Sequence, residues 1–272
     1  MRAHIDCSDE GSGDAVILIH GGASNNRQWK SLIDDLKSRF RVISPNMHGA
    51  GATASWQGPN PYRLADAAAL IERLCDSTAG NVSIVGHSVG GAFAMQAAAQ
   101  LGARVDNLVL LEAAPYDLLR QAGSDHAYRE ALALYEFVRD GSERGDWAAI
   151  AEKFLNTFVG RGTWEKMSDE RRGRAAHLMR QNRAEWDSLM NDRTTLREWS
   201  SRLPHRTLFV SAADTWPPLR ELTNLFVKGC PHWTFAEVPE GGHMAPLYRA
   251  DLVNPIIAEF LCRWRDDPIC PS

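Results

Sequence analysis

The sequence of 272 residues contains no run of 18 consecutive apolar residues, so it predicts no membrane-spanning helix. Its N-terminus also has no apolar stretch of the length of a secretory signal. Thirty basic residues against 34 acidic ones give a net charge of −4, which provides no reason to expect a nucleic acid or an anionic membrane as a partner. We therefore expect a cytoplasmic protein.

Motifs for metals and cofactors are also missing. Cysteine and histidine do not occur in C-x-x-C or H-E-x-x-H spacing, and there is no G-x-G-x-x-G and no phosphate-loop lysine. The five cysteines are scattered, which favours free thiols in a reducing compartment over a pairing of Cys262 with Cys270. The sequence therefore predicts chemistry that needs neither a metal nor a cofactor.

Strands and helices alternate in the first 115 residues and again after residue 204. Apolar runs predict strands, and spacing of apolar residues at three and four predicts helices. Continuous apolar strands between helices are typical of a mostly parallel sheet covered on both faces, an α/β fold. The expected strands are 15–19, 41–44, 82–85, 108–111, 207–211 and 234–238, and the expected helices are 26–40, 64–75, 92–102, 219–227 and 252–265.

The segment 116–203 shows helical periodicity only. Its expected helices are 125–139, 147–158, 169–191 and 195–203. A helical insertion thus separates the earlier strands from the later ones.

The most informative motif is Gly86-His87-Ser88-Val89-Gly90, which follows the apolar strand 82–85 and precedes an alanine-rich helix. In G-x-S-x-G between a strand and a helix, a sharp turn exposes the serine hydroxyl above the sheet. The glycines are required because a Cβ at either position would clash with its neighbours. We therefore interpret Ser88 as a nucleophile rather than as an ordinary turn residue.

Together these features resemble the α/β-hydrolase superfamily over nearly the whole chain. The matching motifs are His20-Gly21-Gly22, the turn at 86–91, Ser211-Ala212-Ala213-Asp214 and Gly242-His243. The order serine, acid, histidine is the order of this superfamily. The resemblance implies a core of residues 1–115 and 204–272, with 116–203 as a helical cap over the active site.

A serine hydroxyl needs an adjacent base, and we expect His243 in that role. Glu112 and Asp214 each follow a strand, and either could orient the imidazole. The run Leu110-Leu111-Glu112, with Gly242-His243-Met244 later, resembles a subgroup of small capped hydrolases, which favours Glu112 slightly. Both acids stay open at this point.

Backbone N–H groups of Gly22 and Val89 are the expected oxyanion donors. His20 and His87 flank the motifs and are interpreted as residues that fix loops. Tryptophans are frequent around the cap, and we expect Trp29, Trp216 and Met244 to line an apolar pocket, with packing between cap and core as the alternative.

The sequence therefore predicts a serine hydrolase that acts on a small ester, lactone or thioester with an apolar acyl or aromatic part. The same residues would also serve carbon–carbon bond hydrolysis or acyl transfer. A ligand receptor with little turnover, built on the same scaffold, is the alternative of another class.

Overall fold

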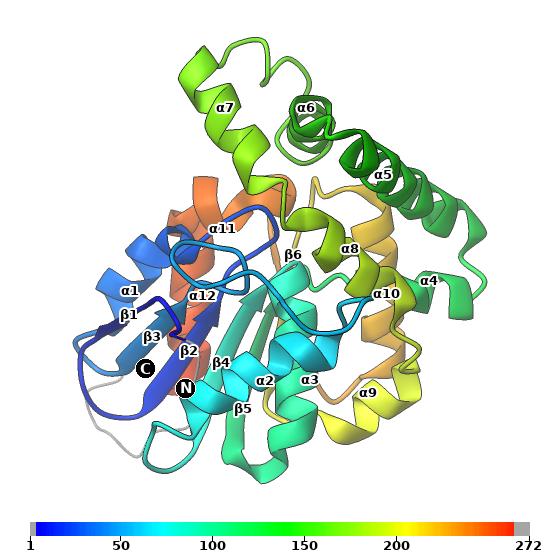
Figure 1. Ribbon diagram of the computed structural model, residues 1–272. Helices are drawn as coiled ribbons and strands as arrows, with labels where there is room; N and C mark the ends of the chain where they lie inside the picture. The colour runs from blue at the N-terminus through cyan, green and yellow to red at the C-terminus, as the bar shows by residue number, and fades with distance from the viewer. Residues whose placement is uncertain (1–3, 264–272) are drawn as a thin grey trace.

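A computed structural model describes residues 4–263, and its central feature is one sheet in the order β1-β3-β2-β4-β5-β6-β7 (Figure 1). The pair β1 and β3 is antiparallel, and the other neighbouring strands are parallel. The strands are β1 (Cys7–Glu10), β2 (Ala15–Ile19), β3 (Arg41–Pro45), β4 (Val82–His87), β5 (Val105–Leu111), β6 (Thr207–Ala212) and β7 (Thr234–Val238).

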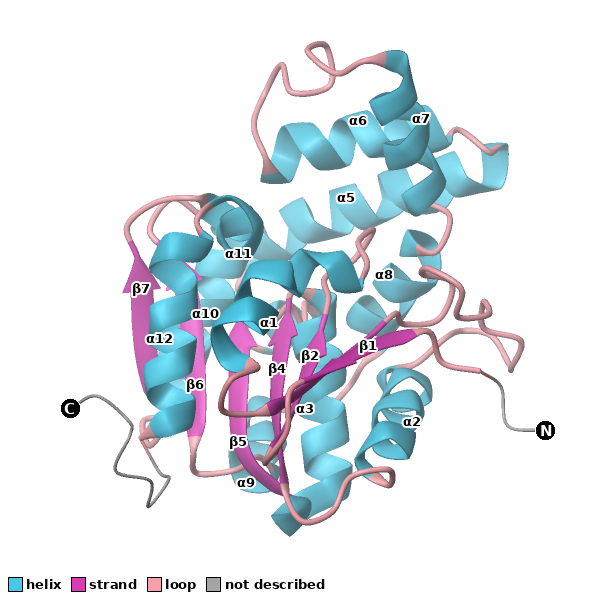
Figure 2. Cartoon of the chain, turned by 90° about the vertical axis from the view of Figure 1, so that its left-hand side faces the viewer, coloured by secondary structure: helices cyan, strands magenta, loops and turns pink. Residues whose placement is uncertain are grey.

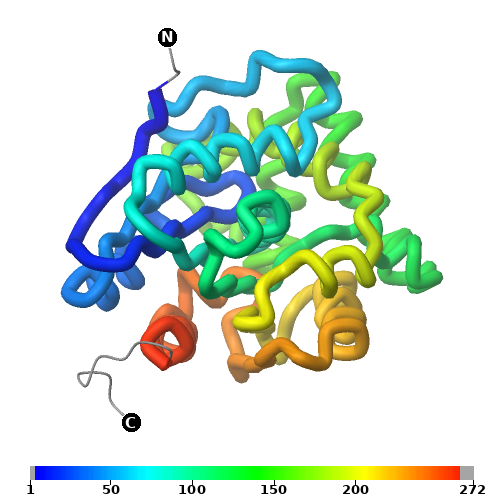
Figure 3. Tube along the Cα trace, turned by 90° about the horizontal axis from the view of Figure 1, so that it is seen from below, coloured from blue at the N-terminus to red at the C-terminus, as the bar shows by residue number. Residues whose placement is uncertain are grey.

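Helices cover both faces of the sheet. The core on one face is completed by α2 (Leu64–Cys75), α3 (Val89–Leu101) and α10 (Pro217–Gly229), and that on the other by α1 (Lys30–Leu36) and α12 (Ala250–Cys262). Seen from below, α12 (red) lies on the opposite side of the strands from α2 and α3 (Figure 3). Because its central strands are buried on both faces, the chain has continuous apolar strands and the predicted α/β fold is confirmed.

Six helices lie in sequence between β5 and β6. They are α4 (Asp117–Gln121), α5 (Asp125–Arg144), α6 (Trp147–Phe158), α7 (Asp169–Leu178), α8 (Asn182–Asn191) and α9 (Leu196–Arg202). Figure 2 shows the arrowheads of the parallel strands directed toward α5, α6 and α7. The carboxyl ends of the strands therefore face this helical layer, and parallel sheets carry their ligand sites at that edge.

The predicted helix 169–191 is two helices. Backbone N–H groups of Met179, Arg180 and Asn182 close turns between α7 and α8. No residue of α7 is buried, whereas α8 buries six, so the two halves present different faces. The break directs Asn182, Glu185, Trp186 and Leu189, at helical spacing, to one side of α8.

Other differences concern the ends of elements. The predicted helix 26–40 begins with a 3-10 turn, Asn26–Trp29, and α1 ends at Leu36. One strand, β1, precedes β2, and because it is half exposed and mostly polar no apolar run marks its bounds. The predicted end of the last helix, at 265, and Cys270 lie outside the described residues. Cys7, Cys75, Cys230 and Cys262 are free thiols. No helix between residues 4 and 263 is long and apolar enough to cross a membrane.

The connection from β4 to α3 is crowded. A Cβ built on Gly90 would lie 2.6 Å from the carbonyl oxygen of Ile19 and closer still to that of His20. A Cβ on Gly86 would lie 2.8 Å from the Cβ of Ala94. The predicted steric need for both glycines is confirmed, because α3 begins in direct contact with the backbone that follows β2.

Gly90→Ala tests this crowding. We expect it to lower the free energy of unfolding by at least about 2 kcal/mol, because the backbone of the sheet cannot yield as a flexible side chain would. Gly173→Ala is the control, since Gly173 lies in α7 and an added Cβ there would have no atom within 4 Å beyond its chain neighbours and the adjacent helix backbone. Denaturant unfolding measures the free energy of unfolding of both variants. Equal values would contradict the crowding at Gly90.

Candidate active site

Ser88 lies at the turn between β4 and α3. Its backbone has φ 57° and ψ −124°, and its N–H donates to the carbonyl of Leu111 over 2.9 Å. Its side chain is half-buried and lies at the carboxyl edge of the sheet. Because Val89 is the first residue of α3, its N–H has no acceptor within the helix and is available beside the Ser88 hydroxyl.

His243 lies within hydrogen-bond distance of both a hydroxyl and a carboxylate. Its Nε2 is 2.9 Å from Ser88 Oγ, and its Nδ1 is 2.9 Å from Glu112 Oε2. Since a carboxylate only accepts, Nδ1 carries the proton and Nε2 is left to accept from the serine hydroxyl. The imidazole is buried between the rings of Phe158 and His87, each with its centroid 4.8 Å away.

The Glu112 carboxylate has two further donors. The N–H of Ala212 donates to Oε1 over 2.9 Å, and the Thr215 hydroxyl donates to Oε2 over 2.6 Å. Ala212 is the last residue of β6 and Thr215 follows it, so the two donors hold the carboxylate at the neighbouring strand. The structure thus brings Ser88, His243 and Glu112 into one hydrogen-bonded chain.

Asp214 lies close by but does not contact His243 in this arrangement. Its two carboxylate oxygens accept from the N–H groups of Gly241 and Gly242, over 3.2 and 2.7 Å. Asp214 is exposed, whereas Glu112 is buried. It therefore fixes the loop that carries the histidine, and Glu112 fixes the imidazole itself.

Strained backbone gathers at these residues. Among the described residues, the non-glycine residues with positive φ are Ala23, Ser88 and Glu112, at 51°, 57° and 45°. Each such conformation costs on the order of 1–3 kcal/mol and persists where the surroundings enforce it. Ala23 follows Gly22 in the loop after β2, so all three strained residues adjoin the same site.

Two buried histidines tie the loops of the site together. The His87 Nε2–H donates to the carbonyl of His243 over 2.8 Å, and the Gln28 amide donates to His87 Nδ1 over 3.1 Å. Gln28 Oε1 in turn accepts from the N–H of Gly21 over 3.1 Å. Burial lowers the pKa of His87 well below its usual range, so it remains neutral in this network.

His20 has a similar structural role. Its Nδ1–H donates to the carbonyl of Gly21 over 2.8 Å, and its Nε2 accepts from the N–H of Met47 over 3.0 Å. Burial lowers the pKa of His20 to about 4, so the ring is neutral at physiological pH. These contacts join the loop after β2 to the loop after β3.

A small cavity of about 20 Å³ adjoins Ser88, and it has room for about one water molecule. Gly22 and Val89 line it beside the serine. The remaining lining residues all belong to the helical segment 116–203, and most of them are aromatic. They are Tyr116, Phe154, Phe158, Asn182, Glu185, Trp186 and Leu189. The rings of Tyr116 and Trp186 are stacked, with centroids 5.1 Å apart.

The structure places the expected pocket residues outside this cavity lining. Trp29 is buried in the core on the α1 and α12 face of the sheet, so it is a packing residue and a correction to the predicted pocket. Trp216 packs edge-on against Tyr116 and Phe158, one layer behind the wall, and its Nε1–H donates to Glu130. Met244 follows His243 and is half-buried against the core.

Sequence reasoning missed the polar residues of the cavity. Asn182 and Glu185 are 2% and 5% exposed, and the Asn182 amide donates to Glu185 Oε2 over 3.1 Å. Burial raises the pKa of the Glu185 carboxyl to about 7, although hydrogen bonds from Asn182 and from the N–H of Ala23 partly oppose this. Only their spacing with Trp186 and Leu189 could have indicated that they share a face of the helix.

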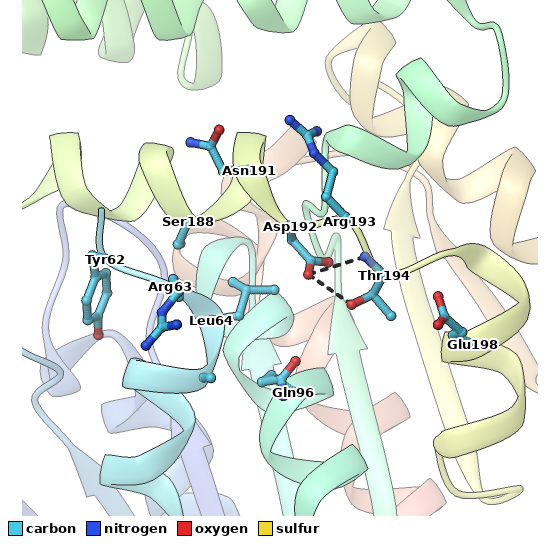
Figure 4. Close-up of a pocket in the computed structure, with 11 residues that line it drawn as sticks. Tyr62, Arg63, Leu64, Gln96, Ser188, Asn191, Asp192, Arg193, Thr194 and Glu198 are labelled. Carbon is cyan, nitrogen blue, oxygen red and sulfur yellow. Dashed lines mark hydrogen bonds between the residues drawn. The ribbon is translucent and has the colours of Figure 1, made fainter. Parts of the chain in front are cut away.

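The described residues also form wider clefts. The cleft of Figure 4, about 470 Å³, lies on the side of α8 that carries Ser188 and Asn191, and its lining does not include Ser88 or His243. A second cleft of about 490 Å³ is lined by the loop after β3 and by residues of α7 and α8, among them Glu185. Glu185 is thus common to the second cleft and to the serine cavity.

A family model described as the alpha/beta hydrolase family matches residues 16–256, and the chain belongs to this family. Its fold is also that of MGS-M2, an alpha/beta hydrolase enzyme from a Medee basin deep-sea metagenome library. That structure is 12% identical and superposes with a TM-score of 0.78, covering 98% of this chain and 97% of the other.

Two curated relatives match parts of the sequence more closely. An uncharacterized protein of Mycobacterium tuberculosis is 38% identical over 107 residues, which are 38% of this chain and 30% of that protein. A pimeloyl-(acyl-carrier protein) methyl ester esterase of Nitrosomonas europaea is 29% identical over 113 residues, 42% of each chain. The matches therefore span less than half the length of these relatives.

The buried Glu185 carboxyl makes stability depend on pH. In the folded chain the Glu185 carboxyl keeps its proton up to about pH 7, whereas in the unfolded chain it releases this proton near pH 4.5. The free energy of unfolding therefore falls as the pH rises from about 4.5 to about 7. We expect Glu185→Gln to remove this loss, so that the variant gains up to about 3 kcal/mol on the wild type between pH 4.5 and pH 8.

Denaturant unfolding at several pH values measures this difference. Glu170→Gln on α7 is the matched control, because the Glu170 side chain is 77% exposed and its replacement should shift the curve little. Wild-type and Glu185→Gln curves that run parallel across this range would refute the raised pKa.

Proposed function

We propose that the protein is a serine hydrolase that acts on a small ester, lactone or thioester through an acyl-enzyme. The observation that carries the proposal is the hydrogen-bonded chain from Ser88 through His243 to Glu112, beside the backbone of Gly22 and Val89. The similarity to an esterase supports the same class of reaction.

In this proposal His243 Nε2 takes the Ser88 proton as Oγ attacks the substrate carbonyl. The N–H groups of Gly22 and Val89 stabilise the oxyanion of the tetrahedral intermediate. Glu112 holds Nδ1–H and stabilises the imidazolium, which then protonates the leaving alcohol or thiol. Water, activated by the same imidazole, attacks the acyl-enzyme, and the acid is released as Ser88 regains its proton.

The segment 116–203 acts as the cap in this account. It supplies the aromatic wall of the cavity through Tyr116, Phe158 and Trp186. Since the cavity holds little more than one water molecule, we infer that α6 and α8 separate from the core when a substrate enters. An apolar acyl group would then replace contacts between the rings and the site.

Ser88→Ala tests the nucleophile. We expect it to reduce the hydrolysis of p-nitrophenyl acetate by at least about 10⁴-fold, since the remaining residues cannot form an acyl-enzyme. Circular dichroism and denaturant unfolding should show an unchanged fold. Turnover at the wild-type rate would exclude the mechanism.

Paired acid variants separate the roles of the two carboxylates. We expect Glu112→Gln to lower kcat by about 10³–10⁴-fold, because an amide no longer fixes the Nδ1–H tautomer. We expect Asp214→Asn to lower it by less than about tenfold, because an amide oxygen still accepts from the loop. The reverse ranking in steady-state kinetics would assign the acid to Asp214.

A series of p-nitrophenyl esters measures the space beneath the cap. We expect kcat/KM to fall from acetate to octanoate, because each added methylene must displace packed aromatic rings. Leu189→Ala removes one wall of the cavity and should raise the relative rate of the longer esters by roughly tenfold. Leu132→Ala, a change in the partly buried face of α5, is the control and should leave the order of preference unaltered. If kcat/KM depends on ester length equally in wild type and Leu189→Ala, Leu189 does not limit the space for the acyl group.

A further inference from the structure

The serine cavity has a polar side that the proposed reaction does not use. Asn182 and Glu185 line it together with Ser88, yet neither contacts Ser88 or His243 through a hydrogen bond. Both side chains are almost completely buried. Burying an amide and a carboxyl costs free energy that an apolar pair of the same size would not cost. Their presence beside a cavity therefore points to a ligand.

The hydrogen bonds of Asn182 and Glu185 leave one acceptor of the pair, Asn182 Oδ1, without a donor. The Asn182 Nδ2–H donates to Glu185 Oε2, so the amide is held with its nitrogen toward the carboxyl group. The N–H of Ala23 also donates to Glu185. Asn182 Oδ1 is buried and has no hydrogen-bond partner within residues 4–263. A buried carbonyl oxygen without a partner has lost the hydrogen bond that it makes in water, and a donor on a ligand would restore that bond.

The pair lies directly over the loop that we assign to the oxyanion. A Cβ built on Gly22 would lie 2.9 Å from Glu185 Oε2 and 3.1 Å from Asn182 Nδ2. A substrate carbonyl that binds the N–H of Gly22 therefore has the pair next to it. A hydroxyl or N–H that the substrate carries close to that carbonyl is then the donor nearest to Asn182.

We propose that Asn182 is a substrate-binding residue whose Oδ1 accepts a hydrogen bond from a hydroxyl or N–H close to the scissile carbonyl, and that Glu185 positions it. The preferred substrates are then esters or thioesters of 2- or 3-hydroxy acids, or of acids with an amide N–H at that place. An acyl group that presents only acceptors or only methylenes leaves Oδ1 unpaired. The proposal deepens the proposed function and rests on it for turnover, but not for binding.

Binding to the Ser88→Ala variant tests the recognition without any reaction. The probes are N,N-dimethyllactamide and N,N-dimethylpropionamide, which have no N–H and differ by one hydroxyl next to the carbonyl. We expect calorimetry to show that the lactamide binds about tenfold more tightly, the typical worth of one hydrogen bond to a buried acceptor. In Ser88→Ala with Asn182→Leu this preference should disappear. Asn191→Leu, at the exposed end of α8, is the matched control and should keep it.

The second arm follows turnover of ethyl lactate and ethyl propionate by titration of the released acid. The ratio of their kcat/KM values should fall about tenfold in Asn182→Leu and stay at the wild-type value in Asn191→Leu. The intrinsic reactivities of the two esters cancel in this comparison of variants. If Asn182→Leu does not fold, Asn182→Ala replaces it.

The outcomes separate the two proposals. Equal affinities of the Ser88→Ala protein for the two N,N-dimethyl amides, or an unchanged kcat/KM ratio in the Asn182 variants, overturn the recognition by Asn182. Turnover that survives Ser88→Ala overturns the proposed function instead, whereas the amide binding experiment still decides the recognition.

Discussion

The carboxylate of Glu112 holds together three segments that are far apart in the sequence. It accepts from His243 near the end of the chain and from Ala212 and Thr215 at the end of β6, while its own backbone follows β5. Each of these hydrogen bonds to a buried charged group is worth about 1.5–3 kcal/mol. The position of the imidazole over Ser88 depends on this one group, and the positive φ of Glu112 is the strain that places it there.

Around this interaction the site combines one half from the sheet and one half from the helical segment. The core supplies Ser88, Glu112 and the loop at Gly22, which are fixed by the buried sheet and by the network of Gln28 and His87. The helical segment supplies aromatic rings and the pair Asn182 and Glu185. In our account the first half performs the chemistry and the second selects the substrate.

The sequence was sufficient for the fold and for the turn at Ser88, because apolar runs and glycine spacing are local signals. The sequence did not decide which carboxylate contacts His243, for a physical reason. Glu112 and Asp214 follow neighbouring strands, β5 and β6, so both lie at the same edge of the sheet. Which carboxylate reaches the imidazole depends on one backbone conformation and on the N–H groups of Gly241 and Gly242, which occupy Asp214.

The helical segment was harder to predict. The periodicity of 169–191 predicted one helix, and the turn at 179–181 that directs Asn182 and Glu185 to the cavity has no glycine or proline to signal it. Trp29 was assigned to the pocket by its residue type, but it packs beside α1 in the core on the face of the sheet opposite α2 and α3. Composition identifies an aromatic residue, and only the packing of helices decides which ring reaches the site.

Labelling with a fluorophosphonate probe is the most direct test of the central claim, that folding activates the Ser88 hydroxyl. Mass spectrometry of the digested protein locates the adduct. Our account predicts one adduct, on Ser88, that forms in the folded protein and is lost when the chain is unfolded in urea before labelling. No adduct on Ser88, or the same labelling of many serines in folded and unfolded protein, would contradict it.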